Sequence, residues 1–346
     1  MVVVSPRRMG KTGLIHHCFH QPEIEEKYYT FFVDIYATNS FRELVYMLGR
    51  QIFDVLKPRG ISFVEHYFSV IASLRPAFKF DSVTGQPVFD IGIGDIHRPE
   101  IAIEEIFSYL EHADRPCFVA IDEFQQIAKY AEKNVEAILR TYIQRCVNTT
   151  FVFAGSQEHM MQKIFFSASR PFYHSASFLH LKPIEYDSYL PFVVQHFSHS
   201  RKFISTEVVK MVYSFFEGHT WYIQLVFNRL FDSAEQGVEI NSDSVKQVID
   251  KIVAENEVMY QNILGFLPER QKEVLIAVAK DRIAINVTSA EFIRRHALAS
   301  SSSVQSSIKT LLDKDLITRI NQSYQVYDRL FALYILNVYG NGYTSD

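Results

Sequence analysis

Cysteine is scarce in this chain: the three cysteines, Cys18, Cys117 and Cys146, lie far apart in a sequence of 346 residues. No two of them have the C-x-x-C spacing of zinc and redox sites, and a disulfide framework would need a denser set. We therefore expect reduced thiols that pack as small apolar side chains, in a protein of the cytoplasm.

Long apolar runs and an excess of positive charge are also lacking. No stretch approaches the roughly 18 consecutive apolar residues of a membrane-spanning helix, and no export signal opens the chain. We therefore expect no contact with a membrane. The 35 Lys and Arg residues face 39 Asp and Glu residues, for a net charge of −4. Any contact with nucleic acid must then come from a local basic patch.

What the chain does have is a phosphate-binding loop near its start. Residues 5–12 read SPRRMGKT and match the pattern G-x-x-x-x-G-K-[ST] at every position but the first. In this pattern backbone N–H groups cradle the phosphates, the Lys reaches the β and γ oxygens, and the Thr hydroxyl holds Mg²⁺. An apolar run suited to a buried strand precedes the loop, and a helix is expected from Gly13. The residues predicted to bind nucleotide are Arg7, Arg8, Met9, Gly10, Lys11, Thr12 and Gly13.

Three features of this loop are unusual. Ser5 replaces the first glycine, so its backbone must stay outside the left-handed region. Arg7 and Arg8 are compatible both with solvated charges and with phosphate contacts. So few residues precede the loop that we expect either a longer N-terminus or recognition of the base supplied from elsewhere in the protein.

A second apolar run ends in two acids, as a Walker B motif does. Residues 117–121 are apolar and are followed by Asp122 and Glu123. A nucleoside triphosphatase needs a metal ion and a group that orients the attacking water. We predict that Thr12 and Asp122 hold the metal and that Glu123 orients the water.

A third apolar run, at 150–155, ends in Ser156 and Gln157. Its strand should lie beside the strand of Asp122, so either side chain could act as a polar sensor next to Glu123. We place Ser156 with Glu123 and Lys11 in the predicted catalytic set. Arg170 precedes a proline and is compatible with an arginine finger that stabilises transition-state charge, or with a surface residue.

Domains usually hold about 100–200 residues, so a chain of this length is expected to have two or three. The spacing of apolar residues indicates three parts. Residues 1–183 predict an α/β P-loop core with a parallel sheet, interrupted by a hairpin insertion near 80–89. Residues 184–265 predict a helical domain, which corresponds to the helical lid implied by the resemblance given below. Residues 266–346 predict three short helices and a β-hairpin, which together form a winged helix. The helices expected in the core and lid are 40–56, 101–112, 135–146, 186–197, 208–216 and 221–231; those of the winged helix are 269–280, 289–296 and 301–314, followed by strands at 316–320 and 324–327.

The winged helix has two interpretations. Its third helix and wing are modestly basic and could contact DNA, or the domain could pack against a neighbouring domain or partner. The polar side chains that would face DNA are Arg294, Arg295, His296, Gln305, Lys309, Lys314 and Arg319.

These residues together resemble the AAA-type P-loop ATPases of archaea and bacteria, close to the STAND and origin-recognition groups. The resemblance spans nearly the whole chain and rests on SPRRMGKTGLI, YYTFFVDIYATNSFREL, CFVAIDEFQQI, FVFAGSQEHMM, SRPFY, EGHTWYIQLVFNRL and YDRLFALYIL. It implies an ATP-binding, Mg²⁺-dependent ATPase that acts as a nucleotide-controlled switch, with ATP and Mg²⁺ as cofactors.

The same resemblance assigns Walker A to Lys11 and Thr12, Walker B to Asp122 and Glu123, and sensor 1 to Ser156-Gln157. Gly218-His219-Thr220 lies where relatives place sensor 2, with Thr220 in place of their proline. His174-Ser175 stands where relatives often have Gly-Arg. The alternatives to a switch ATPase are a DNA-binding regulator, or a scaffold for a protein partner or a homo-oligomer, in which the P-loop is degenerate.

Overall fold

The structure is a computed structural model that describes residues 1–56, 78–80, 87–89, 96–320 and 322–340. The chain folds into two compact units, residues 1–183 and 184–346. Within the described residues, no helix has the length and apolar character to cross a membrane. Cys117 and Cys146 are buried free thiols, as expected, whereas the free thiol of Cys18 is exposed.

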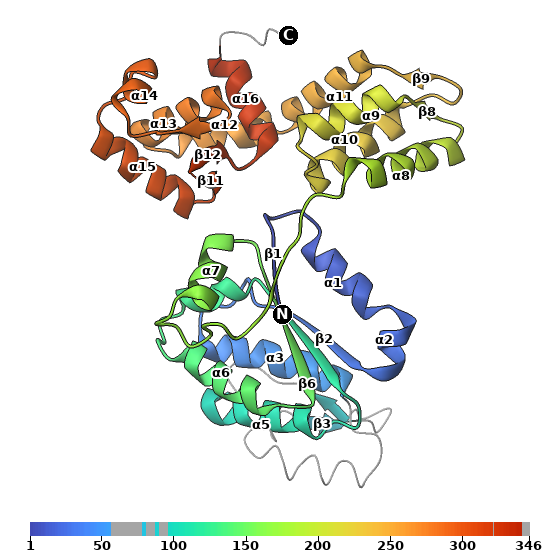
Figure 1. The fold of residues 1–346 in the computed structure, drawn as a ribbon, viewed down its shortest axis with the longest axis vertical. Helices are drawn as coiled ribbons and strands as arrows, with labels where there is room; N and C mark the ends of the chain where they lie inside the picture. Colours follow the sequence, from blue (N-terminus) through green and yellow to red (C-terminus); the bar gives the residue numbers. More distant parts are fainter. Residues whose placement is uncertain (57–77, 81–86, 90–95, 321, 341–346) are drawn as a thin grey trace. The chain divides into compact units, whose positions relative to one another are not determined.

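The first unit is built on a five-stranded parallel sheet of order β2-β5-β6-β1-β7 (Figure 1). This confirms the predicted α/β P-loop core with a parallel sheet. The strands are β1 (Val2–Val4), β2 (Tyr29–Asp34), β5 (Cys117–Asp122), β6 (Thr149–Gly155) and β7 (Phe178–His180). Since β6 pairs with both β5 and β1, the polar ends of three strands meet at one edge of the sheet.

Helices cover both faces of this sheet (Figure 1). Alternate strand residues point to opposite faces, so Val3 packs with Ile15 of α1 on one face, while Val2 and Val4 join the larger core on the other. The helices are α1 (Lys11–Phe19), α2 (Pro22–Lys27), α3 (Phe41–Val55), α5 (Pro99–Glu111), η3 (Phe124–Lys129, a 3₁₀ helix), α6 (Val135–Arg145) and α7 (Glu158–Phe166). Ser40 caps α3, because its side chain accepts a hydrogen bond from the N–H of Glu43.

The expected hairpin insertion is present as an antiparallel pair, β3 (Phe78–Phe80) and β4 (Pro87–Phe89). Its predicted turn around Gly85 lies outside the described residues.

The second unit begins with a group of helices and a two-stranded parallel pair. These elements are α8 (Tyr186–His199), β8 (Phe203–Ile204), α9 (Thr206–Phe215), α10 (Thr220–Ser233), β9 (Glu239–Ile240), α11 (Ser242–Glu255) and α12 (Glu257–Gly265).

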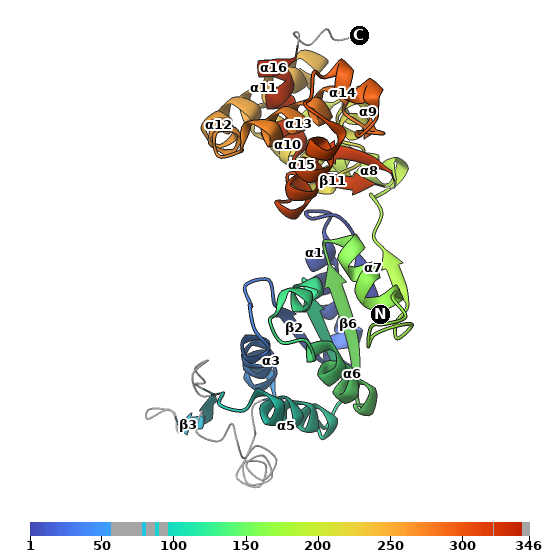
Figure 2. The ribbon, with the colours of Figure 1, turned by 90° about the vertical axis from the view of Figure 1, so that its left-hand side faces the viewer.

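A winged helix completes the second unit, as predicted. Its strands form a sheet of order β10-β12-β11, and α15 lies beside β11 (Figure 2). Ser289 and Ser300 cap α14 and α15 through side-chain hydrogen bonds. The elements are α13 (Glu269–Asp281), β10 (Ala284–Ile285), α14 (Ala290–Arg295), α15 (Ser301–Asp313), β11 (Ile317–Ile320), β12 (Ser323–Val326) and α16 (Arg329–Tyr339).

One hydrophobic core runs through the whole second unit. The ring of Tyr260 in α12 stacks on Phe331 of α16, with centroids 5.0 Å apart. Asp328 caps α16 and also accepts a hydrogen bond from the Tyr222 hydroxyl at 3.3 Å. The guanidinium of Arg329 pairs with Glu217 at 2.6 Å. The winged helix therefore packs on the preceding helices through apolar contacts, the hydrogen bond from Tyr222 to the capping residue Asp328, and the ion pair between Arg329 and Glu217.

Candidate functional site

The loop between β1 and α1 turns through two left-handed residues. Arg8 has φ 64° and Gly10 has φ 97°, whereas Ser5 stays outside the left-handed region, as its side chain requires. Gly10 is the N-cap of α1, so the helix begins at Lys11 and not at Gly13 as the sequence suggested. A non-glycine residue in this conformation stores strain, which is common in loops that bind ligands.

The first turn of α1 is open towards the loop. No side chain caps this helix, and the first N–H groups of any α-helix lack partners within the helix. A Cβ atom at Gly10 or Gly13 would meet no heavy atom within 4 Å. The loop therefore presents backbone donors and the positive end of a helix dipole, which suit an anion.

Lys11 is only 5% exposed and is folded over the loop. Its Nζ donates to the carbonyl oxygens of Ser5 at 2.9 Å and Pro6 at 3.1 Å, and to the Ser5 hydroxyl at 3.4 Å. Burial lowers the pKa of Lys11, and the nearby carboxylates of Glu123 and Asp122 oppose that shift. The ammonium group is thus held inside the loop by its own carbonyls.

Thr12 and Asp122 meet across 110 residues of sequence. The Thr12 hydroxyl donates to Oδ2 of Asp122 at 2.6 Å. Asp122, 4% exposed at the end of β5, also accepts from the backbone N–H of Glu123 at 2.9 Å. The structure therefore brings together the two side chains predicted to hold a metal ion.

Glu123 and Ser156 are also in contact. The Ser156 hydroxyl donates to Oε2 of Glu123 at 2.6 Å, since β6 lies beside β5 as expected. Gln157 takes the N-cap position of α7. Glu123 has φ 56°, so a left-handed backbone directs its side chain at the point where β5 ends.

Gln125 is a member of this cluster that the sequence did not suggest. Its Nε2 donates to Oε2 of Glu123, at a short distance, and to the Ser156 hydroxyl at 3.4 Å. In a sequence, a glutamine two residues after an acidic pair looks like an ordinary solvated residue at the end of a strand. Gln125 differs from such a residue by its burial in η3, at 3% exposure.

The two arginines of the loop differ in environment. Arg7 is half-buried; its Nε lies 3.4 Å from the Ser156 hydroxyl, and its guanidinium lies 5.7 Å from the centre of the Tyr36 ring. Arg8 is exposed. Met9 is buried, at 7% exposure. Arg7 is thus the loop arginine that contacts the Glu123 cluster through Ser156.

Arg170 is held by the core of its own unit. Its guanidinium lies 3.0 Å from Oε1 of Glu136, a side chain that is 8% exposed. Burial raises the pKa of Glu136, and the charge of Arg170 opposes that rise. This ion pair fixes the 167–177 loop to α6.

The segment where sensor 2 was predicted, Gly218-His219-Thr220, forms a strained turn with Glu217 in the second unit. Glu217 and Gly218 have φ 53° and 71°, and His219 is the N-cap of α10. Thr220 is the first residue of that helix.

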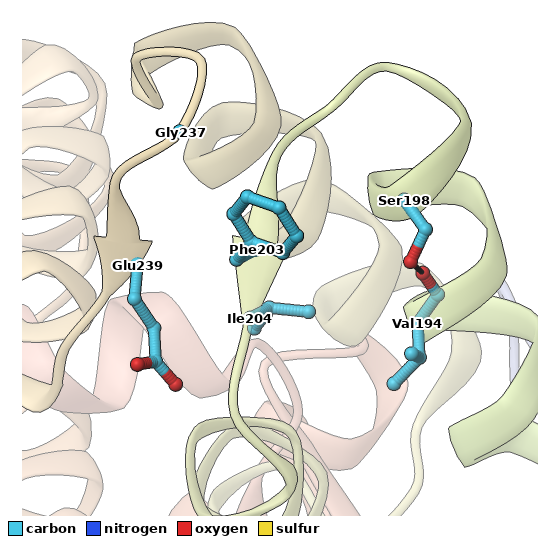
Figure 3. A pocket seen from close by; sticks show the side chains of 6 residues that line it. All are labelled: Val194, Ser198, Phe203, Ile204, Gly237 and Glu239. Atoms are coloured by element: carbon cyan, nitrogen blue, oxygen red, sulfur yellow. Dashed lines mark hydrogen bonds between the residues drawn. The ribbon is translucent and has the colours of Figure 1, made fainter.

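A surface hollow of about 370 Å³ lies elsewhere in the second unit, between α8 and the β8–β9 pair (Figure 3). The Ser198 hydroxyl donates to the carbonyl of Val194 in its own helix at 2.7 Å. The hollow shares no residue with the cluster around Lys11 and Glu123, and its lining offers no comparable set of charged groups. The lining residues are Val194, Ser198, Phe203, Ile204, Gly237 and Glu239.

Comparison with known families defines the class of protein. Residues 1–226 match the family described as "ATPase domain predominantly from Archaea", which covers more than half of the chain. The chain therefore belongs to this family of ATPases. Residues 258–337 match a "Probable winged helix domain", which confirms the predicted C-terminal fold. No curated protein matches the sequence.

Solved structures share this fold at low sequence identity. A Walker-type ATPase of Pyrococcus abyssi is 13% identical over 97% of this chain and 90% of its own, with a TM-score of 0.59. The ORC2 protein of Aeropyrum pernix, solved with ADPNP and ADP, is 13% identical over 98% of this chain and 87% of its own, with a TM-score of 0.56. The P-loop core with a C-terminal winged helix is therefore the architecture expected from the sequence.

Proposed function

We propose that this chain binds ATP with Mg²⁺, hydrolyses it, and changes the position of its second unit with the nucleotide state. The observation that carries the proposal is the cluster at one edge of the sheet, where Lys11, Thr12 and Asp122 meet Glu123 and Ser156. The first turn of α1 and the ends of β5 and β6 supply it, and its pairs Thr12–Asp122 and Ser156–Glu123 are each 2.6 Å apart.

The phosphate groups would lie against the first turn of α1. The amides of residues 7–13 supply donors there, and the Lys11 ammonium is already inside the loop. A phosphate oxygen would replace the carbonyls of Ser5 and Pro6 as partners of Lys11. The nucleotide-bound state of the Aeropyrum ORC2 structure, which shares this fold, supports ATP as the ligand.

The residues present also fit Mg²⁺. This ion takes oxygen ligands and usually keeps several waters while it binds one or two protein oxygens and the substrate phosphates. Thr12 and Asp122 offer a hydroxyl and a carboxylate that already lie side by side. When bound, Mg²⁺ would neutralise charge on the phosphate oxygens.

Glu123 is the proposed base that orients the attacking water, and Ser156 is the proposed sensor beside it. One oxygen of the Glu123 carboxylate is fixed by donors from Ser156 and Gln125. Within the described residues, its other oxygen accepts no protein hydrogen bond, which leaves it available for water.

We further propose a three-part organisation in which residues 184–265 form a lid and residues 266–346 a winged helix. The resemblance places sensor 2 at the turn Gly218-His219-Thr220, with Thr220 in place of the proline of relatives. Its neighbours Glu217 and Tyr222 contact Arg329 and Asp328 at the start of α16. A change at this turn would therefore reach the winged helix directly.

Calorimetry with Mg·ATP tests the proposal. Lys11→Ala should abolish binding, because it removes the cation that faces the phosphates. Glu123→Gln should keep ATP affinity within about twofold and lower turnover by about 10²-fold or more, since it removes a general base. Tight ATP binding by Lys11→Ala would contradict the loop assignment, and unchanged turnover in Glu123→Gln would contradict the role of that carboxylate.

DNA is the second candidate ligand, through the winged helix. The observation in its favour is the exposure of the cationic side chains Arg294, Arg295 and Lys309 on α14 and α15. If wild-type protein binds neither Mg·ATP nor DNA, the remaining hypothesis is that the protein is a scaffold for a protein partner.

A further inference from the structure

A closed ring of hydrogen bonds links three side chains of the proposed catalytic cluster. Ser156 Oγ donates to Glu123 Oε2 at 2.6 Å, and Gln125 Nε2 donates both to the same carboxylate oxygen and to Ser156 Oγ at 3.4 Å. Arg7 Nε adds a contact to Ser156 Oγ at 3.4 Å. One carboxylate oxygen of Glu123 therefore has two donors, one from η3 and one from the end of β6.

The direction of the Gln125 amide is dictated by its neighbours. A carboxylate accepts hydrogen bonds only, so the NH₂ end of the amide must face Glu123. The opposite end, Oε1, is buried and has no hydrogen-bond partner. Leaving an acceptor unsatisfied costs free energy, so the amide is placed for its contact with Glu123 and not for its own stability.

Gly155, the last residue of β6, provides the space for this amide. A Cβ atom at Gly155 would lie 2.6 Å from Gln125 Oε1 and 2.6 Å from the sulfur of Met161. Any larger residue would displace one of these side chains. The φ of Gly155 is not in the left-handed region, so its backbone conformation does not require glycine. Glycine is needed there because the side chains of Gln125 and Met161 approach so closely.

We propose that Gln125 is a positioning residue that fixes the Glu123 carboxylate for catalysis, an inference that rests on the proposed ATPase function. The Ser156 hydroxyl has a single proton, which it donates in a hydrogen bond to Glu123 in this structure. When Ser156 turns its proton to a phosphate oxygen, Glu123 loses that donor. Gln125 then remains as the donor that keeps the carboxylate in place.

The test compares Gln125→Met with its neighbour Gln126→Met. Methionine keeps the length of the side chain and removes the amide. Gln126 is the matched control, because it also lies in η3 and its Nε2 donates to the Thr38 carbonyl at 2.9 Å, outside the cluster. Each variant loses the hydrogen bonds of one amide group, two in Gln125→Met and one in Gln126→Met, so a merely structural effect should appear in both.

Three measurements on the full chain are compared. Calorimetry should give an unchanged Mg·ATP affinity for both variants. Single-turnover hydrolysis should fall by about 10–100-fold in Gln125→Met and by less than about twofold in Gln126→Met, since small misplacement of a reacting group costs rates of this order. On a Glu123→Gln background, Gln125→Met should cause no further loss, because it acts through the carboxylate.

A readout without nucleotide completes the test. In the nucleotide-free protein, the Tm changes of Gln125→Met and Glu123→Gln should be non-additive, because the two side chains are bonded to each other. Gly155→Ala should reproduce the lower turnover of Gln125→Met by displacing the amide. Equal turnover in wild type and Gln125→Met, or additive losses on the Glu123→Gln background, would overturn the inference. A wild type that binds no Mg·ATP would instead overturn the proposed function.

Discussion

Burial of the Lys11 side chain costs folding free energy, even though this lysine is proposed to bind phosphate. The residue is 5% exposed, and its ammonium group donates hydrogen bonds to loop carbonyls. Its pKa is lowered by burial, so the folded protein holds the proton less well than the unfolded chain does. Residues that bind charged ligands commonly reduce the stability of the ligand-free protein.

We therefore expect Lys11→Met to raise the Tm of the nucleotide-free protein at neutral pH, by about 2–4 °C if the cost is about 1 kcal/mol. The cost is fully present at every pH below the lowered pKa of Lys11. It disappears as the pH rises towards the ordinary lysine value of about 10.4. Scanning calorimetry at several pH values from 7 to 10.5 measures the difference from wild type.

The control is Lys129→Met, because Lys129 is exposed in the same unit. It should leave Tm within about 1 °C of wild type, as surface substitutions usually do. A Lys11→Met protein that is less stable than wild type at pH 7, or a difference that does not shrink with pH, would show that burial of the ammonium carries no net cost.

Residues of the site differed in how far the sequence revealed them. Lys11, Thr12, Asp122 and Glu123 could be named because their chemistry requires a fixed order after apolar runs. Gln125 could not, because its importance comes from being buried beside Glu123 and from the space left by Gly155. Burial and space are properties of packing, which a local pattern does not contain.

Among the strands of the parallel sheet, β1, β5 and β6 were predictable because site motifs follow them, and β7 was not. Each of these three strands contains a continuous apolar run, since strands covered by helices on both faces need such runs. β7 has three residues, pairs only with β1 and was missed. A strand of that length has too few residues for a period to be seen, and its existence depends on the neighbour it pairs with.

The helices α13, α14 and α15 of the winged helix were predicted from apolar spacing, and α16 was not. Ser289 and Ser300 cap α14 and α15, and serine is a residue type that favours this position. The segment of α16 is apolar on most sides, because it packs on both α11 and α13. A helix buried on several sides loses the one-sided pattern by which helices are recognised.

The charge on α15 leads to a prediction for DNA. If α15 contacts the phosphate backbone, Lys309→Ala should weaken binding of a duplex of about 20 base pairs. It should also reduce the slope of log K against log[salt] by about 0.9, the value for one phosphate contact. Fluorescence anisotropy at four salt concentrations measures both quantities.

Lys246→Ala is the matched control, because Lys246 is an exposed lysine on α11 of the same unit. It should leave affinity and slope unchanged. If both variants reduce the slope equally, the attraction is a general effect of charge; if neither does, α15 is not the DNA contact.

At the scale of the whole molecule, the helices of residues 184–265 and the winged helix depend on each other for stability. The core of the second unit includes Val212 and Ile223 from the helices and Leu311 and Ile335 from the winged helix. Removing either part would expose apolar side chains of the other, at roughly 25 cal/mol for each Å².

The single tryptophan provides a test of this dependence. Trp221 lies in α10, whereas Phe331 lies in α16 and is 2% exposed. We expect Phe331→Ala to lower the guanidinium midpoint of the Trp221 fluorescence transition, by an amount that corresponds to about 3–5 kcal/mol. The probe then reports a loss made in a different part of the unit.

Phe53→Ala is the control, because Phe53 is 1% exposed in the separate core of the first unit. It should leave the Trp221 midpoint near the wild-type value. A Trp221 midpoint that Phe331→Ala does not move would show that the helices of residues 184–265 and the winged helix unfold independently.

The contact between Tyr260 and Phe331 also bears on how such a protein can diversify. Exchange of the C-terminal module by recombination would place a foreign surface against Tyr260, Tyr222 and Glu217, and the hybrid would lose the packing, the cap and the ion pair together. Shuffling of such modules would therefore destabilise the second unit. Exposed positions on α14 and α15, such as Arg294 and Lys309, can instead change without disturbing this core.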